Sequence, residues 1–417
     1  MKRSFVVLLL ILLSFFSLQS QTQLSDSTKI SLLTANPWPS AVYAIFGHTA
    51  ILVVDDSTQI DLVFNYGFFD SSKPHFIYHF VRGETDYILG ITSYSEFLAE
   101  YKYKGVEVVE QELNLSKSEK QEMWNALYLN ALPENREYRY NYFYDNCATR
   151  PRDIIENYIK GEVRYTPTDK PQSYRDLVDE CTRNFPWIQF GISLLIGTEA
   201  DRIIDVREKM FIPSYLKNSF EDATIFKNDT LQYPLVKSQN VILEENLPSS
   251  ESNIFRNVLK PFIFGWIMLI LTLIISMVQV VKFNKARIPK IFDTIIFGIA
   301  GLGGLTVFFL MYFSLHPATN PNWNFVWLNV FALIAVPLFW VKSLKNVVYI
   351  YHFINFATLT FFLACWIFIP QQLHLATIPF SMCLWIRSGI NAWIFRKGKK
   401  KNKRFSSPEA LKAGWGH

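Results

Sequence analysis

Long apolar stretches fill the C-terminal part of the chain, whereas the residues before about position 258 mix apolar and polar side chains as a globular domain does. Five of these stretches have about 17–25 residues, the length that crosses a bilayer as a helix. They cover residues 261–281, 291–315, 325–341, 347–369 and 373–395. The pattern therefore predicts five transmembrane helices between residues 258 and 395.

Lys and Arg residues are concentrated in alternate connections between these helices. The connections at 282–290 and 342–345 and the tail at 396–417 are basic, whereas those at 316–324 and 370–372 contain neither Lys nor Arg. Because basic loops stay on the cytoplasmic side of a membrane, we expect the residues before the first helix outside the membrane and the tail in the cytoplasm. The net charge of +5 lies largely in that tail, next to lipid headgroups, so it does not indicate nucleic acid binding.

Residues 1–20 have the pattern of a secretory signal peptide, in which two basic residues precede an apolar run of about a dozen residues. Cleavage is expected near Ser20 or Gln21, and an uncleaved signal anchor is the alternative. A cleaved signal peptide and an uncleaved signal anchor predict the same domain organisation. Residues 21–237 are expected to form the exported, periplasmic domain, in which the candidate catalytic residues described below lie, and residues 238–257 are expected to form a polar linker to the first membrane helix.

The exported domain contains patterns of both strands and helices. Apolar, β-branched runs at 50–56 and 61–70 flank a short polar turn, which predicts a β-hairpin. Apolar residues at helical spacing predict one helix after a capping Ser116 and a second helix over 152–161.

Cys147 lies in the sequence YFYDNCATR, directly before the second of these helices, and Pro151 indicates that the helix begins near Thr149. The start of a helix stabilises a thiolate, and a nucleophilic cysteine needs a base beside it. His48 follows a glycine at the edge of the strand FGHTAILVV. It is the candidate base.

Other interpretations of these residues stay open. A lone cysteine is more often a small buried side chain than a nucleophile, and Cys181 offers a disulfide as the rival explanation in an exported domain. Asp145 and Asn146 occupy positions typical of helix caps. The aromatic residues between 138 and 144 line either a core or a groove for an acyl chain.

Four ordered blocks resemble the Lnb N-terminal periplasmic domain family, namely residues 32–53 around His48, 63–69, 140–153 around Cys147, and 194–216. This family includes the Bacteroides lipoprotein N-acyltransferase. It is distantly similar to the circularly permuted NlpC/P60 enzymes and to the lecithin:retinol acyltransferases, which carry a histidine before an Asn-Cys motif. The sequence LHPATNPNWN resembles the outward loop of the membrane-attached members.

The resemblance implies an α+β fold, with a papain-like, permuted NlpC/P60-type periplasmic domain followed by a five-helix transmembrane bundle. It makes Cys147 the nucleophile and His48 its base. Asn65 is the candidate that orients the histidine, and His75 and His79 are alternatives further along the chain. The sequence contains no signature of a metal or cofactor site.

Three further residues are candidates for substrate binding. Arg150 and Arg152 could bind a lipid phosphate, because an arginine fork matches phosphate, or they could be solvated or pair with Asp153. Tyr144 could line the groove for an acyl chain.

The activity that the resemblance implies is that of an inner-membrane lipoprotein N-acyltransferase. An acyl chain would pass from a phospholipid to Cys147 as a thioester, and then to the N-terminal amine of a diacylglyceryl-cysteine lipoprotein. The alternative is a membrane-tethered papain-like hydrolase that cuts peptidoglycan peptides or amides, and a non-catalytic envelope protein is a third interpretation. An apolar channel at the cysteine would favour transfer, and an open polar groove would favour hydrolysis.

Two polar features of the membrane part complete the expectations. Arg387 lies in the last apolar stretch near its cytoplasmic end, where its long side chain is expected to reach the headgroups. His316 and the asparagines that follow it either present lipid headgroups or turn the chain at the interface.

Overall fold

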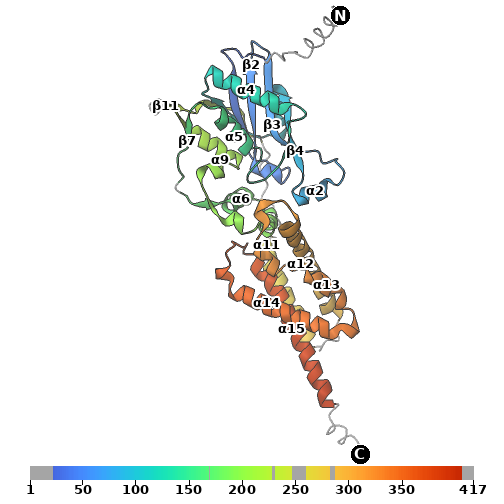
Figure 1. The fold of residues 1–417 in the computed structure, drawn as a ribbon. Helices are drawn as coiled ribbons and strands as arrows, with labels where there is room; N and C mark the ends of the chain where they lie inside the picture. Colours follow the sequence, from blue (N-terminus) through green and yellow to red (C-terminus); the bar gives the residue numbers. More distant parts are fainter. Residues whose placement is uncertain (1–21, 169, 228–230, 247–259, 282–286, 406–417) are drawn as a thin grey trace, which may run out of the picture. The chain divides into compact units, whose positions relative to one another are not determined.

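The computed structural model describes residues 22–168, 170–227, 231–246, 260–281 and 287–405 (Figure 1). The predicted signal peptide and residues 247–257 of the predicted linker lie outside these ranges. The chain forms two compact units whose segments alternate along the sequence. Unit 1 lies within residues 1–69, 86–167 and 206–247, and unit 2 lies within residues 70–85, 168–205 and 248–417.

Unit 1 is built on an antiparallel seven-stranded sheet with the strand order β12-β5-β1-β2-β3-β4-β6 (Figure 1). These strands are β1 (Lys29–Ala35), β2 (His48–Asp55), β3 (Ile60–Phe68), β4 (Asp86–Ser93), β5 (Val108–Leu113), β6 (Glu137–Arg139) and β12 (Val236–Leu243). The predicted hairpin is confirmed as β2 and β3, with Ala50 opposite Asn65. A smaller sheet contains β7 (Glu162–Arg164), β10 (Thr224–Lys227) and β11 (Leu231–Pro234).

Helices cover both faces of the large sheet. They are α3 (Tyr94–Lys104), α4 (Lys117–Ala131), α5 (Thr149–Tyr158), α8 (Val206–Lys209) and α9 (Pro213–Glu221), with a 3-10 turn η1 (Tyr43–Phe46) before β2. Because side chains alternate along a strand, Ile51 and Val53 of β2 pack in the core with α4, α5 and α9, whereas Ala50 and Leu52 pack in the core with α3. Ser116 caps α4 as predicted, by accepting a hydrogen bond from the backbone N–H of Glu119.

The linker prediction is wrong for residues 238–243, which belong to the edge strand β12 and pair with β5. Most side chains of β12 are exposed or half-buried, so the strand is held by backbone hydrogen bonds rather than by an apolar pattern. A polar edge strand of this kind looks like a linker in the sequence. The sheet domain therefore extends to Leu243.

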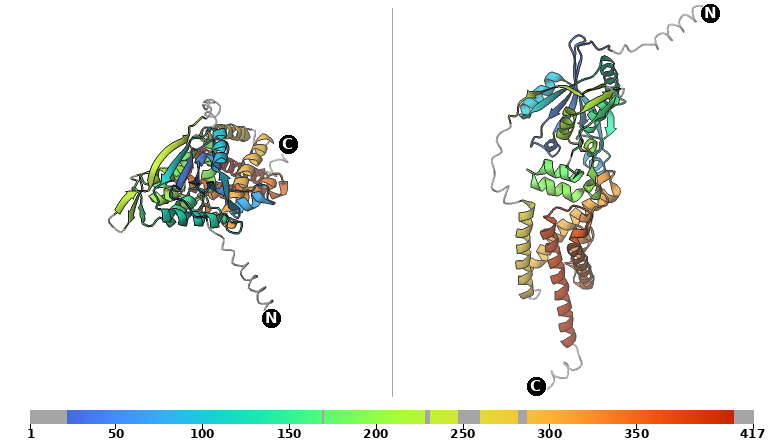
Figure 2. Two further views of the ribbon diagram at one scale, coloured as in Figure 1. Left: turned by 90° about the horizontal axis from the view of Figure 1, so that it is seen from above. Right: turned by 90° about the vertical axis from the view of Figure 1, so that its left-hand side faces the viewer.

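Unit 2 contains the apolar C-terminal helices and two segments from the part of the chain before residue 237. Its helices are α2 (Phe76–Arg82), α6 (Tyr174–Thr182), α7 (Pro186–Leu195), α11 (Pro261–Val281), α12 (Arg287–Phe313), α13 (Phe331–Leu338), α14 (Lys345–Ala364) and α15 (Thr377–Phe405). Short elements connect them, namely β8 (Gln172–Ser173), β9 (Ile203–Ile204) and the 3-10 turns η2 (Thr198–Asp201), η3 (Pro317–Thr319), η4 (Trp323–Val326), η5 (Lys342–Leu344) and η6 (Trp366–Phe368). Helix α15 packs along both α11 and α14 (Figure 2).

Three helices in the described part of the chain are long and apolar enough to cross a membrane: Pro261–Val281, Arg287–Phe313 and Lys342–Ala364. The helix predicted over 325–341 is instead the turn η4 and the eight-residue α13. Its backbone approaches α12 closely, since a Cβ on Gly304 would lie 2.3 Å from the Leu328 carbonyl oxygen. The fifth predicted stretch lies in α15, whose 29 residues include Arg387 and continue into the basic residues 396–404, so that its mean hydropathy is lower.

Arg387 does not extend to the headgroups as predicted. Its guanidinium is fully buried and donates to both carboxylate oxygens of Asp293 on α12, at 2.6 and 2.9 Å. It also donates to Ser276 Oγ at 2.9 Å and to the amide oxygen of Gln279, both on α11. The ion pair and its hydrogen bonds therefore join three helices. A buried acidic partner on a neighbouring helix stabilises the Arg387 charge better than extension of the side chain to the lipid headgroups would.

The loop after α12 attaches to the end of α7. The backbone N–H of Gly197 donates to Ala318 O at 2.7 Å, and that of Thr198 donates to Pro321 O at 2.9 Å. Asn322 Nδ2 donates to the carbonyl oxygens of Leu194 and Leu195 at 2.9 and 3.1 Å. These contacts give Asn322 and residues 194–198 of the fourth sequence block a structural role. Asn322 satisfies carbonyl groups that the end of a helix leaves open.

Candidate active site

Cys147 lies against the start of β2, the strand that begins with His48. The backbone N–H groups of Thr49 and of Cys147 itself are directed at the Cys147 sulfur, and the Thr49 hydroxyl donates to the Cys147 carbonyl oxygen. On the neighbouring strand, a Cβ on Gly67 would lie 3.5 Å from Cys147 Cβ. Ala50 lies opposite Asn65 in the β2–β3 pair. Two residues further along each strand, the same register places His48 beside Gly67. The structure thus brings the cysteine to the strand positions beside the histidine.

Asn65 holds the His48 ring. The distance between His48 Nε2 and Asn65 Oδ1 is 3.4 Å, and Asn65 Nδ2 donates to Val63 O and Thr92 Oγ1 at 3.4 and 3.3 Å. These two hydrogen bonds orient the Asn65 side chain so that its amide oxygen faces the His48 ring. An amide oxygen accepts hydrogen bonds and cannot donate them. The proton of the neutral imidazole is therefore on Nε2, which leaves Nδ1 as the nitrogen that can accept a proton.

The Asn146 side chain binds backbone N–H groups at the start of α5. Its buried side chain accepts hydrogen bonds from the N–H groups of Ala148 and Thr149 at 2.7 and 2.9 Å. The same side chain donates to Tyr142 O and Phe211 O, both at 2.8 Å. The expectation that Asn146 caps the helix is confirmed, and the helix begins at Thr149.

Burial keeps both reacting groups neutral. It raises the pKa of the Cys147 thiol to about 11, although the N–H groups of Thr49 and Cys147 act in the opposite direction. Burial also lowers the pKa of His48 to about 4, and the hydrogen bond that the ring donates to the Asn65 amide oxygen offsets part of that effect. Burial of Cys147 therefore acts against the thiolate predicted at the helix start, because desolvation outweighs the two backbone N–H groups.

Four tyrosines surround the sulfur. Burial raises the pKa of Tyr87, Tyr101, Tyr138 and Tyr140, and a negative charge on Cys147 would raise each of them further. The rings of Tyr87 and Tyr140 stack with their centroids 4.1 Å apart, and the His48 ring lies parallel to that of Tyr101, at 6.5 Å and an angle of 12°. The side chains around the half-buried cysteine are therefore mainly aromatic.

The two arginines near Cys147 are engaged within unit 1. Arg150 donates to both oxygens of Asp145 at 2.5 and 2.8 Å and lies 3.6 Å from the centre of the Tyr138 ring. Arg152 is 5% exposed and donates to Asp153 and to Arg207 O, both at 2.8 Å. A lipid phosphate would have to displace these partners. Tyr144, the third residue predicted to bind substrate, is 39% exposed.

The structure adds residues that the sequence analysis missed and leaves others out of the site. Thr49 and Gly67 contact the cysteine, and their one signal in the sequence is their position next to His48 and in the strand that carries Asn65. His75 and His79 lie in unit 2, where His79 Nδ1 is 3.4 Å from Glu84. The third position beside His48 is occupied by Asn65.

The other three cysteines, Cys181, Cys365 and Cys383, lie in unit 2. All four cysteines lie within the described residues and are free thiols, so the structure contains no disulfide between Cys147 and Cys181. Burial raises the pKa of Cys181 to about 12. In the part of the chain that the structure describes, no group of three or more His, Cys, Asp or Glu side chains is arranged to hold a metal ion.

Comparisons with known proteins give two matches. Residues 17–180 match the model of the Lnb N-terminal periplasmic domain, and residues 251–399 match the model of the Lnb transmembrane domain. No curated protein and no solved structure matches the chain. The two matches agree with the family that the sequence blocks indicate, and they cover the catalytic candidates His48, Asn65 and Cys147.

Proposed function

Since the chain belongs to the Lnb family, and is therefore an inner-membrane protein with a periplasmic domain, we propose that it is a thiol-dependent lipoprotein N-acyltransferase. The acyl donor is a phospholipid, and the acceptor is the N-terminal amine of a diacylglyceryl-cysteine lipoprotein. Cys147 is the nucleophile, His48 is the general base, and Asn65 positions the histidine.

The observation that carries this proposal is the aromatic environment of the half-buried Cys147. Tyr87, Tyr101 and Tyr138 are each less than 10% exposed. Such surroundings favour an acyl chain as the bound group and disfavour the water that a hydrolase needs beside its thioester. A peptidoglycan hydrolase would be better served by an open polar groove.

The first half-reaction forms the thioester. His48 Nδ1 takes the proton of the Cys147 thiol as the sulfur attacks the ester carbonyl carbon of the phospholipid. The tetrahedral intermediate then releases the glycerol oxygen, which takes the proton back from His48 and leaves as the lysophospholipid. A neutral thiol beside a neutral imidazole suits this concerted transfer, because no buried charge exists before the substrate arrives.

The second half-reaction forms the amide. The neutral α-amine of the lipoprotein attacks the thioester carbonyl carbon while His48 Nδ1 takes one of its protons. The carbon–sulfur bond then breaks, the proton passes to the Cys147 sulfur, and the thiol is restored. In both halves the N–H groups of Thr49 and Cys147, which are directed at the sulfur, lie close to where the oxyanion forms and supply its hydrogen bonds.

The membrane arrangement is part of the same proposal. Unit 1 corresponds to the papain-like domain, with a cysteine at a helix start and a histidine on a strand. The three long helices together with residues 323–338 and α15 make five crossings, which leaves residues 396–417 in the cytoplasm. Alternating basic connections support this topology. Both lipid substrates belong to the outer leaflet, so a membrane-attached enzyme meets them there.

The test is mass spectrometry of a model lipoprotein expressed together with the full-length protein in cells that lack any other N-acyltransferase. We expect a third acyl chain with the wild type and none with Cys147→Ala, and a rate lowered about 100- to 10,000-fold with His48→Ala. Cys181→Ala is the matched control, since this thiol is free and lies outside unit 1.

A lipoprotein that stays diacylated with the wild type would contradict the proposal. Analysis of muropeptides from the same cells would then show whether the site is that of the alternative hydrolase. Incubation with phospholipid alone gives an independent check, because the acyl mass should appear on the peptide that contains Cys147.

A further inference from the structure

Helix α2 exposes large apolar side chains on an exported segment. Ile77, Tyr78 and Phe80 are 77%, 51% and 47% exposed in a helix of seven residues. Apolar surface in water costs about 25 cal/mol per Å², and adjacent exposed side chains of this kind mark a binding or membrane surface. Contact of α2 with lipid would remove these apolar side chains from water.

The outer end of α12 holds α2 in place. The backbone N–H of Leu315 donates to Arg82 O at 2.7 Å, and His316 Nε2 lies 2.9 Å from Phe80 O. Gly83 ends α2 with φ +69°, and a Cβ there would lie only 3.1 Å from the His316 backbone nitrogen. A short helix is thus fixed at the position where the α12 span ends, and His316 serves this contact.

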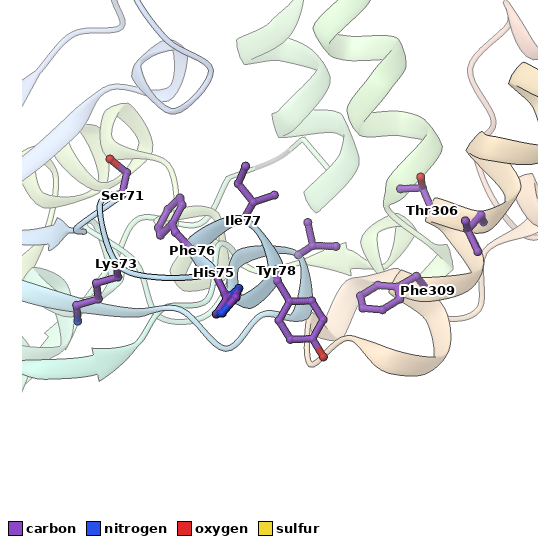
Figure 3. Close-up of a pocket in the computed structure, with 10 residues that line it drawn as sticks. Ser71, Lys73, His75, Phe76, Ile77, Tyr78, Thr306 and Phe309 are labelled. Atoms are coloured by element: carbon purple, nitrogen blue, oxygen red, sulfur yellow. The ribbon is translucent and has the colours of Figure 1, made fainter.

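A groove of about 820 Å³ lies between residues 71–81 and α12 (Figure 3). It is lined by Ser71, Lys73, His75, Phe76, Ile77, Tyr78 and Val81 on one segment, and by Leu305, Thr306 and Phe309 on α12. The Thr306 hydroxyl donates to Leu302 O at 3.1 Å, so its polar group is already satisfied. Apart from Ser71, Lys73, His75 and Thr306, the lining is aliphatic or aromatic, and the volume is in the range that holds a small ligand.

The depth of the groove matches the outer leaflet. Helix α12 ends at Phe313, so Phe309 and Thr306 lie about 6 and 10 Å below that end at 1.5 Å per residue. Side chains of α12 at this level are exposed on the surface of the span, as the 44% exposure of Leu305 illustrates. The groove is therefore continuous with the lipid-facing surface of a membrane span.

We propose that this groove binds an acyl chain of an outer-leaflet phospholipid, with the phosphate of its headgroup at Lys73. Its role as the donor site rests on the proposed function. The cation distinguishes the two lipid substrates, because a phospholipid carries a phosphate and a diacylglyceryl-cysteine does not. Along the chain, Ser71 follows β3, the strand of Asn65 and Gly67, after only two residues.

Photo-crosslinking in proteoliposomes tests the proposal without requiring catalysis. The full-length Cys147→Ala protein is reconstituted in phosphatidylethanolamine and phosphatidylglycerol vesicles, with a trace of phosphatidylethanolamine that carries a diazirine on one acyl chain. We expect the label on residues 71–81 and 305–309. Thr306→Trp, which fills the groove, should reduce labelling about tenfold, as for loss of a buried chain segment, and Leu302→Trp on the same helix should not.

Lys73→Gln tests the headgroup contact, because it removes the positive charge of this exposed residue and keeps a polar side chain. It should weaken labelling by the phospholipid about tenfold, as for one charge-assisted hydrogen bond, and should not change labelling by a diazirine-bearing diacylglyceryl lipopeptide. Equal labelling of Thr306→Trp and Leu302→Trp, or groove labelling by the lipopeptide that matches the phospholipid, would overturn the proposal.

The outcome is separable from that of the proposed function. Groove labelling that depends on Thr306 and Lys73, in a protein whose wild type transfers no acyl chain, would keep the lipid site and reject the acyltransferase. Acyl transfer by the wild type without labelling of these residues would keep the acyltransferase and reject the groove.

Discussion

Cys147 is held mainly through its backbone and its neighbours rather than through its own side chain. Asn146 caps the helix that follows, and the Thr49 hydroxyl binds the carbonyl group of the cysteine. These contacts fix the sulfur while burial keeps it protonated. Since the thiolate is the form that oxidants attack, a protonated thiol also suits an enzyme that works in an oxidising compartment.

The pH dependence of Cys147 alkylation follows from its raised pKa. Because the folded protein binds the thiol proton up to about pH 11, the rate of reaction with iodoacetamide should rise about tenfold per pH unit between pH 7 and 10 without levelling off. Mass spectrometry of the Cys147 peptide measures this rate. In guanidinium the same peptide should level off above about pH 8.5, the ordinary value of a cysteine.

A plateau below pH 8 in the folded protein would show a thiolate–imidazolium pair before substrate binding. The concerted proton transfer proposed above would then be wrong, even if the acyltransferase activity is correct.

At the residue scale, the sequence predicted which side chains meet but not how each one is used. The β2–β3 hairpin makes His48 and Asn65 neighbours. Its register could be predicted because the two strands flank a short polar turn. The partners of Arg150 and Arg152 were harder to predict, because Arg152 also binds the carbonyl of Arg207, 55 residues away. The neutral state of Cys147 depends on burial by tyrosines from three separate segments, which no local pattern reveals.

Strand β2 owes its start at His48 to Gly47. This glycine has φ +82° and ψ −171°, and a Cβ there would lie 2.8 Å from Ala35 O. Other residues are strained in such a conformation. The glycine therefore determines where the strand begins, and with it the position of His48.

Gly47→Ala should destabilise the protein by about 1–3 kcal/mol, the usual range for a residue forced into such a conformation. Thermal unfolding of the full-length protein in detergent measures the loss. Gly191→Ala in α7 is the control, because no atom lies within 4 Å of its added Cβ. That substitution should be neutral or stabilising by up to about 1 kcal/mol, and equal losses from both would show that the conformation of Gly47 is unimportant.

Elements with a strong local pattern were predictable, and those held by distant partners were not. Helix α4 has both helical spacing and a capping box, so its start was correctly predicted. Strand β12 lacks an apolar pattern and exists because β5 has a free edge for it. The break before α13 results from close approach to Gly301 and Gly304 on α12, which an apolar run of suitable length does not show.

At the scale of the whole molecule, one ion pair connects the helices of unit 2. Arg387 and Asp293 are 0% and 4% exposed, and Ser276 and Gln279 bring α11 into the same network. The sequence contains the acid and the base in two apolar stretches, but assigning one to the other requires the packing of α12 against α15.

Arg387→Met should destabilise the helix assembly by about 3–5 kcal/mol, because it leaves the Asp293 carboxylate buried without a partner. The yield of monodisperse protein after detergent extraction measures the effect. The double substitution Arg387→Met with Asp293→Leu removes both charges and should restore most of the yield. A double variant no better than the single one would contradict a pairing between these two residues.

The alternation of the two units along the chain has a consequence for synthesis. The carbonyl groups at the end of α7 bind Asn322 and Gln371, yet the chain between Leu195 and Gln371 takes roughly 10–35 s to synthesise at about 5–20 residues per second. During that time residues 168–205 are already exported and lack their partners. Periplasmic proteases can cut this segment in any chain whose last helices fail to insert, so the survival of each molecule depends on completion of its membrane part.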